Sequence, residues 1–354
     1  MSHFCLLSQP QDYTVQDWDL VRDPQGREYW LKHFAEHMDY VLEAALVRYG
    51  PAARGRTIKA RQAFAADLAR LAEKPDALPG GMLRVIDLCR LREKALRDHK
   101  LPDPFGHVKQ RENATALELY PTVIQRLDGL EAKARWLHLV KCIFAGNIFD
   151  LGCKETMKYA NDGVDLFKVI SELPARPWLV DDYDALEKVL PIEGVAQWSK
   201  AVIFLDNAGA DFVLGAMPLA RALALDGVKI VLAANEQPAL NDITVDETIA
   251  LVEQIAAFDD DVDDLIAAGM FEVVSSGNDV PLIDLSEVSD ELNEAAQGAE
   301  LVVLEGMGRS VESNFTTPFA CDALRLCMLK DQAIARRIGG KVFDVVCRYV
   351  SAGQ

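Results

Sequence analysis

A short stretch in the second half of the chain decides the fold: residues 201 to 209 read AVIFLDNAG. Five apolar residues precede an aspartate, an asparagine and, one residue later, a glycine. A continuous apolar run of this length predicts a strand that is buried on both faces, as in a parallel sheet. The glycine allows a tight turn into the next element. The stretch therefore predicts a central strand that ends in polar side chains.

Similar apolar runs recur through the second half of the chain. They cover residues 228–233, 271–274, 301–304 and 342–346. Segments long enough for helices separate them, which indicates a doubly wound, mostly parallel sheet with covering helices. We therefore expect an α/β domain over residues 176–354.

The first half of the chain has a helical rhythm instead. Between residues 28 and 49, apolar side chains recur at steps of three and four and predict a helix with one buried stripe: Trp30, Phe34, Met38, Val41 and Ala45. Further helical patterns cover residues 57–72, 82–97 and 115–141, and we expect a break at Gly146 and Asn147. A mainly α-helical domain over residues 1–175 should therefore precede the α/β domain.

The net charge of −18 is concentrated in the second half of the chain. From residue 201 onward, nine Lys and Arg residues stand against 26 Asp and Glu residues, whereas the first 200 residues are nearly balanced. Such an acidic surface repels a phosphate backbone, which argues against nucleic acid as a partner. A small anionic substrate would be accepted only if a bound cation lay between it and the carboxylates.

Other features favour a cytoplasmic location. The amino terminus lacks the basic start and the apolar stretch of a signal peptide. No run approaches the roughly 18 apolar residues that a membrane span needs. The seven cysteines are an odd set without a C-x-x-C pair, which is typical of reduced thiols. We therefore expect a cytoplasmic protein that does not contact a membrane.

Polar side chains follow the predicted strands at the point where each strand ends. They are Asp206 and Asn207 after the first strand, Asn235 and Asp242 after the second, and Glu305 and Arg309 after the fourth. Ligands of doubly wound sheets bind beyond the carboxyl ends of the strands, so these side chains should lie together. Their oxygens suit hard cations such as Mg²⁺ or Mn²⁺, and a guanidinium can hold two phosphate oxygens at once. Every histidine lies in the first half, which argues against zinc or Ser-His chemistry in the α/β domain.

Simpler interpretations of the same residues stay open at this point. Asp206 could be the N-cap of the following helix, and Asp242 could belong to an ordinary turn. Glu305 could be a structural carboxylate that only holds Arg309. A silent protein that binds a nucleotide or a phosphometabolite is the alternative from another functional class. The two glycines at 306 and 308 resemble the start of a dinucleotide site, but the third glycine of that pattern is absent.

The predicted helix of residues 28–49 also contains the pattern H-x-x-E-H, at His33, Glu36 and His37. Two histidines four residues apart share one face of a helix and could bind zinc, as in one class of metalloproteases. The buried stripe with Trp30 and Phe34 accounts for this helix as a packing element. We therefore interpret the pattern as a chance match.

In combination and in this order, three segments resemble the damage-control phosphatase family, formerly known as domain of unknown function 89. Residues 205–209 read LDNAG, residues 238–244 read PALNDIT, and residues 305–309 read EGMGR. The pentapeptide EGMGR is the signature of the second subfamily, which includes stand-alone plant proteins and the phosphatase domain of a pantothenate kinase paralogue. Residues 145–150 and 176–182 also resemble family segments, so the likeness covers most of the chain.

The resemblance implies a Rossmann-like α/β domain packed against a helical domain. It also implies a divalent metal ion (Mn²⁺, Co²⁺, Ni²⁺ or Mg²⁺) held by Asp206, Asn207 and Asp242. The implied reaction is hydrolysis of small phosphomonoesters, namely 4′-phosphopantetheine and its oxidised or otherwise damaged forms.

On this interpretation, the metal lowers the pKa of a bound water, and Arg309 stabilises the charge on the phosphoryl oxygens. Glu305 is the candidate for orienting or deprotonating that water. Asn147 and Asn235 are expected to bind the substrate, Asn147 from across the cleft. A covalent route with Asp206 as the nucleophile is less favoured, because Ala208 stands where such phosphatases have a second aspartate.

Overall fold

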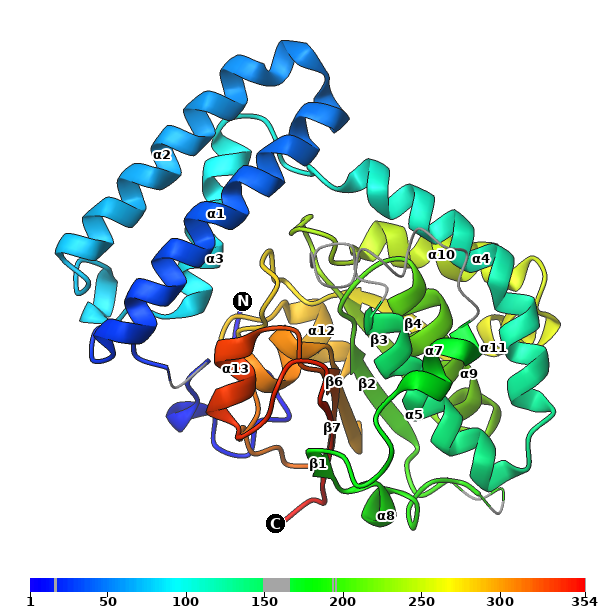
Figure 1. The fold of residues 1–354 in the computed structure, drawn as a ribbon. Helices are drawn as coiled ribbons and strands as arrows, with labels where there is room; N and C mark the ends of the chain where they lie inside the picture. The colour runs from blue at the N-terminus through cyan, green and yellow to red at the C-terminus, as the bar shows by residue number, and fades with distance from the viewer. Residues whose placement is uncertain (16–17, 149–165, 193, 195, 354) are drawn as a thin grey trace.

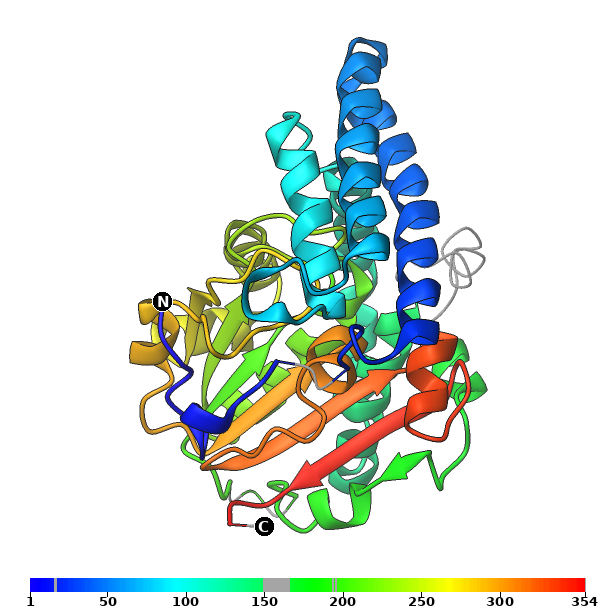
Figure 2. The ribbon, with the colours of Figure 1, turned by 90° about the vertical axis from the view of Figure 1, so that its left-hand side faces the viewer.

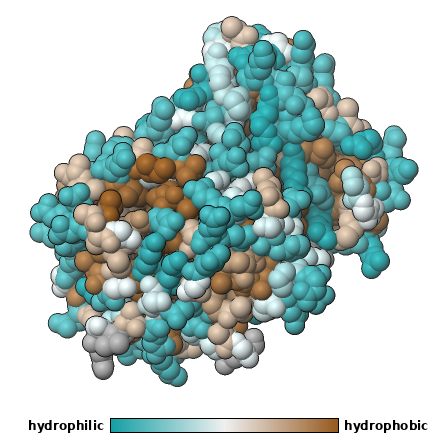
Figure 3. Space-filling view, turned by 180° about the vertical axis from the view of Figure 1, so that it is seen from behind, coloured by the Kyte–Doolittle hydropathy of each residue, from teal (hydrophilic) through white to brown (hydrophobic). Residues whose placement is uncertain are grey.

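An arm of three long helices projects from the rest of the molecule in the computed structural model (Figure 1, Figure 2). The structure describes residues 1–15, 18–148, 166–192, 194 and 196–353. The helices of the arm are α1 (Pro24–Tyr49), α2 (Arg54–Glu73) and α3 (Val85–Asp98), which confirms the three helices expected there. Their apolar side chains, such as Phe34 and Phe64, share one buried cluster. The face of the arm that Figure 3 shows is mainly hydrophilic.

The helical pattern of residues 115–141 corresponds to two helices rather than one. These are α4 (Gly106–Asp128) and α5 (Ala132–Ile148), and the chain turns at Gly129 between them. Glycine destabilises a helix interior, so it was the available signal for this boundary. The apolar pattern continued across it because both helices bury a stripe in the same core.

The break that we expected at Gly146 and Asn147 does not occur, because α5 continues through both residues. A Cβ atom on Gly146 would lie 2.9 Å from the carbonyl oxygen of Ala210 and 2.9 Å from the Cα atom of Asp211. Glycine is therefore needed here so that two helices can approach closely, and not to end a helix.

A seven-stranded sheet forms the centre of the body, in the order β1-β7-β6-β5-β2-β3-β4. The strands are β1 (Val180–Asp181), β2 (Lys200–Phe204), β3 (Lys229–Ala234), β4 (Phe271–Ser275), β5 (Leu301–Glu305), β6 (Asp322–Met328) and β7 (Val345–Val350). All neighbouring strands are parallel except β6 and β7. The expected doubly wound sheet is thus confirmed.

Strand β6 was missed from the sequence, and β7 begins three residues after the start of the apolar run at 342–346. Asp322 and Arg325 interrupt the apolar pattern of β6. The Arg325 side chain is nevertheless 1% exposed, because it donates hydrogen bonds to the carbonyl oxygens of Asn314 and Thr317. Because a buried arginine interrupts it, this strand lacks the continuous apolar run by which we identified the others.

Helices cover both faces of the sheet. The remaining elements are α7 (Leu166–Glu172), α8 (Tyr183–Leu186), η4 (Asp211–Ala216), α9 (Met217–Leu225), α10 (Val245–Ala256), α11 (Asp260–Ala267), α12 (Asp290–Ala295), η5 (Gly308–Glu312) and α13 (Gln332–Arg337). Alternate residues of β2 face opposite layers: Ala201 and Ile203 join the core with α5 and α9, and Val202 and Phe204 pack with Phe4 on the other face.

The buried clusters divide the chain differently from the expected boundary at residue 175. Helices α4, α5 and α7 share one core with the sheet, whereas α1 to α3 form a second core with residues of the sheet's carboxyl edge, among them Leu282 and Cys327. The boundary at residue 175 therefore does not coincide with a change of core. No helix in the described part of the chain is long and apolar enough to cross a membrane.

The order of the strands reverses between β2 and β5. From β2 the chain moves outward to β3 and β4, and then returns to place β5 on the other side of β2. A crevice forms at the carboxyl ends of strands where the order reverses in this way. The segments after β2, β3 and β5 are therefore the places to look for a site.

Candidate active site

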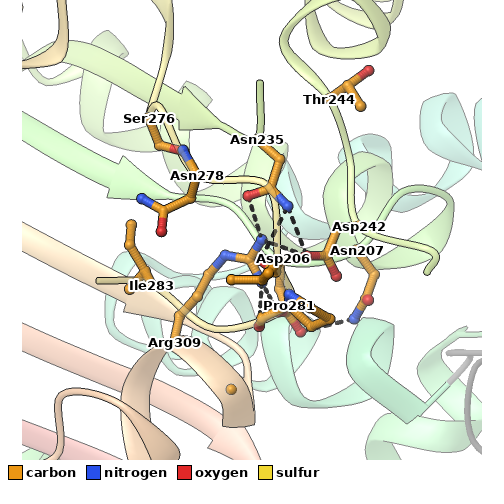
Figure 4. Close-up of polar contacts among 12 residues, drawn as sticks. Asp206, Asn207, Asn235, Asp242, Thr244, Ser276, Asn278, Pro281, Ile283 and Arg309 are labelled. Carbon is orange, nitrogen blue, oxygen red and sulfur yellow. Dashed lines mark hydrogen bonds and ion pairs between the residues drawn. The ribbon is translucent and has the colours of Figure 1, made fainter. Parts of the chain in front are cut away.

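The side chains of Asp206, Asn207 and Asp242 come together at the carboxyl ends of β2 and β3 (Figure 4). Backbone contacts fix the two loops to each other: Ile243 donates to the carbonyl oxygen of Asp206 at 3.0 Å, and Ala208 donates to that of Asn241 at 3.0 Å. The three polar side chains are between 2% and 7% exposed. The sheet thus places the predicted ligand trio in one buried cluster.

Neither aspartate caps a helix. Ala210 is the N-cap of η4, and Thr244 caps α10 by accepting a hydrogen bond from the backbone of Glu247. The Asp206 carboxylate instead accepts hydrogen bonds from the amide nitrogens of Asn147 at 3.2 Å and Asn207 at 2.8 Å. The simpler helix-cap interpretation is therefore wrong for Asp206.

Arg309 lies between the two aspartates. Its guanidinium is 2% exposed, pairs with Asp206, and donates to Asp242 at 3.0 Å and to Asn235 at 3.1 Å. Asn235 also donates to Asp242 at 2.9 Å. Burial lowers the pKa of Arg309, but the charges of Asp242 and Asp206 outweigh it and raise that pKa overall. The guanidinium thus holds the two carboxylates at a fixed spacing.

This position differs from what the sequence suggested for Arg309. We expected a guanidinium open to a phosphoryl group, or one paired with Glu305. The structure shows it bonded to Asp206, Asp242 and the carbonyl oxygen of Pro281, and it does not line the cavity described below. The difference follows from burial, which the sequence does not reveal: a buried arginine among acidic residues pairs with them and offsets part of their charge.

Glu305 lies behind Asp206, deep in the protein. Its side chain is 1% exposed and both carboxyl oxygens lack a hydrogen-bond partner among the described residues. Burial, together with Asp211 and then Asp206, raises the pKa of Glu305 well above its usual value. Its side chain does not line the cavity in which we expected it to orient or deprotonate a water.

Asp211 is a site residue that sequence reasoning missed. One of its oxygens accepts hydrogen bonds from Asn147 at 2.7 Å and from the side chain of Asn207 at 2.7 Å. The signal was its position four residues after Asn207, one helical turn along the segment that follows β2. Asn147 is fully buried and bonds Asp206 and Asp211, so it supports the cluster from behind instead of facing a cleft. Asn235 does the same at Asp242.

A cavity of about 580 Å³ opens above the ligand trio, between the α/β body and the arm. Asp206, Asn207 and Asp242 form part of its lining, and His33 and His37 of α1 line it as well. The buried stripe expected for α1 is confirmed, since Trp30 and Phe34 are each 4% exposed. Our view of α1 as a packing element alone was incomplete, because its other edge reaches the cavity.

Glu312, at the end of η5, is a second site residue that the sequence did not single out. It lines the same cavity. Burial, with smaller contributions from Asp331 and Asp206, raises the pKa of Glu312 to about 8. Near neutral pH this side chain is therefore largely a neutral acid in the cavity wall.

The donor atoms of the trio fit a hard divalent cation. Among the described residues, no three His, Cys, Asp or Glu side chains are grouped so that they could hold a metal alone. Two carboxylates and the Asn207 amide are available. The Asn207 nitrogen donates to Asp206 and Asp211, which turns the amide oxygen away from both. Ions such as Mg²⁺ commonly take one or two carboxylates and fill the remaining positions with water and substrate phosphate.

Known proteins are similar to this chain over most of its length. A damage-control phosphatase of Arabidopsis thaliana is 40% identical over 303 residues, which cover 84% of this chain and 81% of that protein. Pantothenate kinase 2 of the same plant is 37% identical over 98% of this chain. The mouse 4′-phosphopantetheine phosphatase is 31% identical over 97% of it. This chain spans 41% of the length of the plant kinase and 48% of the length of the mouse protein.

The fold also has a counterpart among solved structures. A DUF89 family protein from Pyrococcus horikoshii superposes with a TM-score of 0.63 at 18% identity, and the match covers 90% of this chain and 96% of that one. The family model described as the damage-control phosphatase ARMT1-like domain matches residues 33–346. The chain therefore belongs to the damage-control phosphatase ARMT1-like domain family.

Proposed function

We propose that this protein is a metal-dependent phosphatase that hydrolyses small phosphomonoesters. The observation that carries the proposal is the convergence of Asp206, Asn207 and Asp242 on the wall of one cavity at the switch point of the sheet. Two relatives that match most of this chain are named as a damage-control phosphatase and a 4′-phosphopantetheine phosphatase. We extend the proposal to 4′-phosphopantetheine and its damaged forms as substrates, and to Mg²⁺, Mn²⁺, Co²⁺ or Ni²⁺ as the metal.

In this proposal Asp206, Asn207 and Asp242 hold the cation. The cation, when bound, offsets the negative charge of the substrate and makes a water molecule more acidic. Asp206 and Asp242 would accept hydrogen bonds from that water, whereas the phosphate, an acceptor like them, would be held by the cation. Arg309 would hold these two carboxylates at a fixed spacing, and its single charge offsets one of their two negative charges.

The residues behind the trio act as positioning residues. Asn147 and Asp211 hold the carboxylate of Asp206 and the amide of Asn207 in place. Asn235 fixes Asp242. The described cysteines form no disulfide, which supports a reducing compartment such as the cytoplasm as the site of action.

The test is a turnover assay on metal-free protein. Phosphate release from phenyl phosphate and from 4′-phosphopantetheine should be negligible in chelator and should appear when Mg²⁺, Mn²⁺, Co²⁺ or Ni²⁺ is added. Asp206→Asn keeps the shape of the side chain but removes one ligand charge, and should lower kcat/KM at least about a hundredfold. Asp290→Asn, at an exposed aspartate, is the matched control.

Two results would count against the proposal. Full activity of the chelated protein would remove the metal from the reaction. Tight binding of 4′-phosphopantetheine without any phosphate release would favour the alternative of a silent phosphometabolite-binding protein.

A further inference from the structure

Helix α4 contacts both of the loops that carry the proposed metal ligands. The helix leaves the arm and runs along the body (Figure 1). Lys109 and Asn113 lie four residues apart on α4 and therefore share one of its faces. Lys109 reaches the loop that follows β3 and carries Asp242. Asn113 reaches the loop that follows β2 and carries Asp206. Neither Lys109 nor Asn113 is part of the cavity lining.

The Lys109 side chain is fully buried, and its ammonium lies among oxygen atoms. The Nζ atom donates to the carboxylate of Glu247 at 3.0 Å and to the carbonyl oxygen of Asp242 at 3.4 Å. An oxygen of Asp103 lies 3.6 Å away. Glu247 in turn accepts hydrogen bonds from the backbone and the side chain of Thr244, the N-cap of α10. One ammonium therefore holds this loop both at the ligand residue and at the start of the next helix.

Asn113 holds the other loop by its backbone. The Oδ1 atom of Asn113 accepts a hydrogen bond from the backbone N–H of Gly209 at 2.6 Å. Gly209 has a φ of +74°, and a Cβ atom there would lie 2.9 Å from the Cβ atom of Glu112. The glycine therefore allows α4 to approach the loop closely. Because backbone hydrogen bonds also join the two loops to each other, α4 restrains both of them together.

These contacts matter more for the spacing of the ligands than for the stability of the fold. A buried ion pair contributes little net stability, because the cost of desolvation offsets the attraction. A metal site, in contrast, needs its ligands within about 0.5 Å of their working positions. A small shift of either loop should therefore weaken cation binding while the sheet and its covering helices stay folded.

We propose that Lys109 and Asn113 are positioning residues of the metal site, which hold its two ligand loops at the separation that one divalent cation needs. This inference rests on the proposed function, because it takes Asp206, Asn207 and Asp242 as the ligands of the cation. Neither positioning residue touches the cation or the substrate. Loss of the groups that support metal ligands typically weakens metal binding roughly ten- to a hundredfold.

The first experiment is calorimetry with Mn²⁺ on protein freed of metal by a chelator. Lys109→Met removes the ammonium and keeps most of the length of the side chain, whereas Asn113→Leu removes the acceptor and keeps the size. Each should raise the dissociation constant for Mn²⁺ about tenfold or more. Asn113→Asp keeps an oxygen that can accept from Gly209 and should bind Mn²⁺ about as tightly as the wild type.

Lys200 offers a matched control at the opposite edge of the sheet, where β2 begins. Its Nζ atom donates to the carbonyl oxygens of Ala295 and Gln297, at 2.9 Å each, so this ammonium also holds backbone in place. Lys200→Met should lower the free energy of unfolding but leave the dissociation constant for Mn²⁺ unchanged. The proposal is wrong if Lys109→Met and Asn113→Leu bind Mn²⁺ as the wild type does, or if Lys200→Met weakens binding equally.

A measurement without metal separates this inference from the proposed function. Hydrogen exchange of the chelated protein reports on the bond from the Ile243 N–H to the carbonyl oxygen of Asp206, which joins the two loops. Lys109→Met should speed exchange at Ile243 about tenfold, whereas Lys200→Met should not. Unchanged exchange beside normal Mn²⁺ binding by the wild type would overturn the positioning role alone. Absence of Mn²⁺ binding by the wild type would refute the metal site itself, and this inference with it.

Discussion

Arg309 is the residue whose observed environment differs most from the one that the sequence suggested. The sequence indicated a phosphate ligand, and on that basis its replacement by lysine should leave the melting temperature unchanged. In the structure the guanidinium joins Asp206 to Asp242 and is 2% exposed. An ammonium is a compact charge that cannot reproduce this planar, two-sided contact.

Arg309→Lys should therefore lower both activity and stability. We expect kcat/KM to fall about ten- to a hundredfold, because Asp206 and Asp242, the proposed metal ligands, lose their fixed spacing. The free energy of unfolding should fall by about 2 kcal/mol, since one buried carboxylate is left unpaired. Steady-state kinetics and thermal unfolding measure the two effects. Arg22→Lys, at a side chain that is 89% exposed, is the control. A normal melting temperature with reduced turnover would instead support the hypothesis that Arg309 binds the phosphoryl group.

The turn from β5 into η5 lies directly against the side chain of Asp206. Gly306 begins this turn with a φ of +82°, and a Cβ atom there would lie 2.1 Å from the Cγ atom of Asp206. The glycine of EGMGR is thus needed twice, for its backbone conformation and for the space that Asp206 occupies. Only the first need can be inferred from a sequence pattern.

Gly306→Ala separates these two needs when it is compared with Gly298→Ala. Gly298 also has a positive φ, of +75°, but nothing lies within 4 Å of its added Cβ atom. Both variants should lose about 1 kcal/mol of stability from the backbone conformation. Gly306→Ala should in addition displace Asp206 and lower kcat/KM more than about a hundredfold. Thermal unfolding and metal-titrated kinetics test this. Similar activity of the two variants would show that the turn adjusts without moving Asp206.

At the level of elements, the sequence predicted what local periodicity encodes. The apolar runs of β2 to β5 and the helices of the arm were found because burial on both faces, or along one stripe, leaves a visible pattern. Strand β6 was missed because Asp322 and the buried Arg325, which donates to two backbone oxygens, interrupt its apolar pattern. The continuation of α5 was missed because Gly146 serves a contact with Ala210, which is distant in the sequence.

For the whole molecule, local sequence patterns likewise predict only part of the candidate site. Asp206, Asn207 and Asp242 could be predicted because strand ends meet at a switch point. His37 could not be predicted as part of the cavity, because its place there depends on how the arm packs against the body. The depth of Glu305 and Arg309 behind the trio was equally hidden, since strand-end position indicates the edge of the sheet but not the distance to solvent.

The stability of the whole molecule should also respond to pH through the cavity. The pKa of Glu312 is about 8 in the folded protein, against an ordinary value of 4.5, because of burial and the nearby charges of Asp331 and Asp206. The folded state therefore binds this proton more tightly than the unfolded state does. The free energy of unfolding should therefore fall as the pH rises from 4.5 to about 8, and should level off above that pH.

Glu312→Gln should remove this contribution, because a glutamine stays neutral at every pH. Unfolding in denaturant, measured with chelator present because a cation beside Asp206 would lower the pKa of Glu312, should give similar stabilities near pH 4.5 for variant and wild type. The variant should become more stable as pH rises, by on the order of a few kcal/mol at pH 8. Glu294→Gln, at an exposed glutamate, should follow the wild type throughout. Parallel curves for Glu312→Gln and the wild type would mean that the cavity stays open enough to water to keep Glu312 charged.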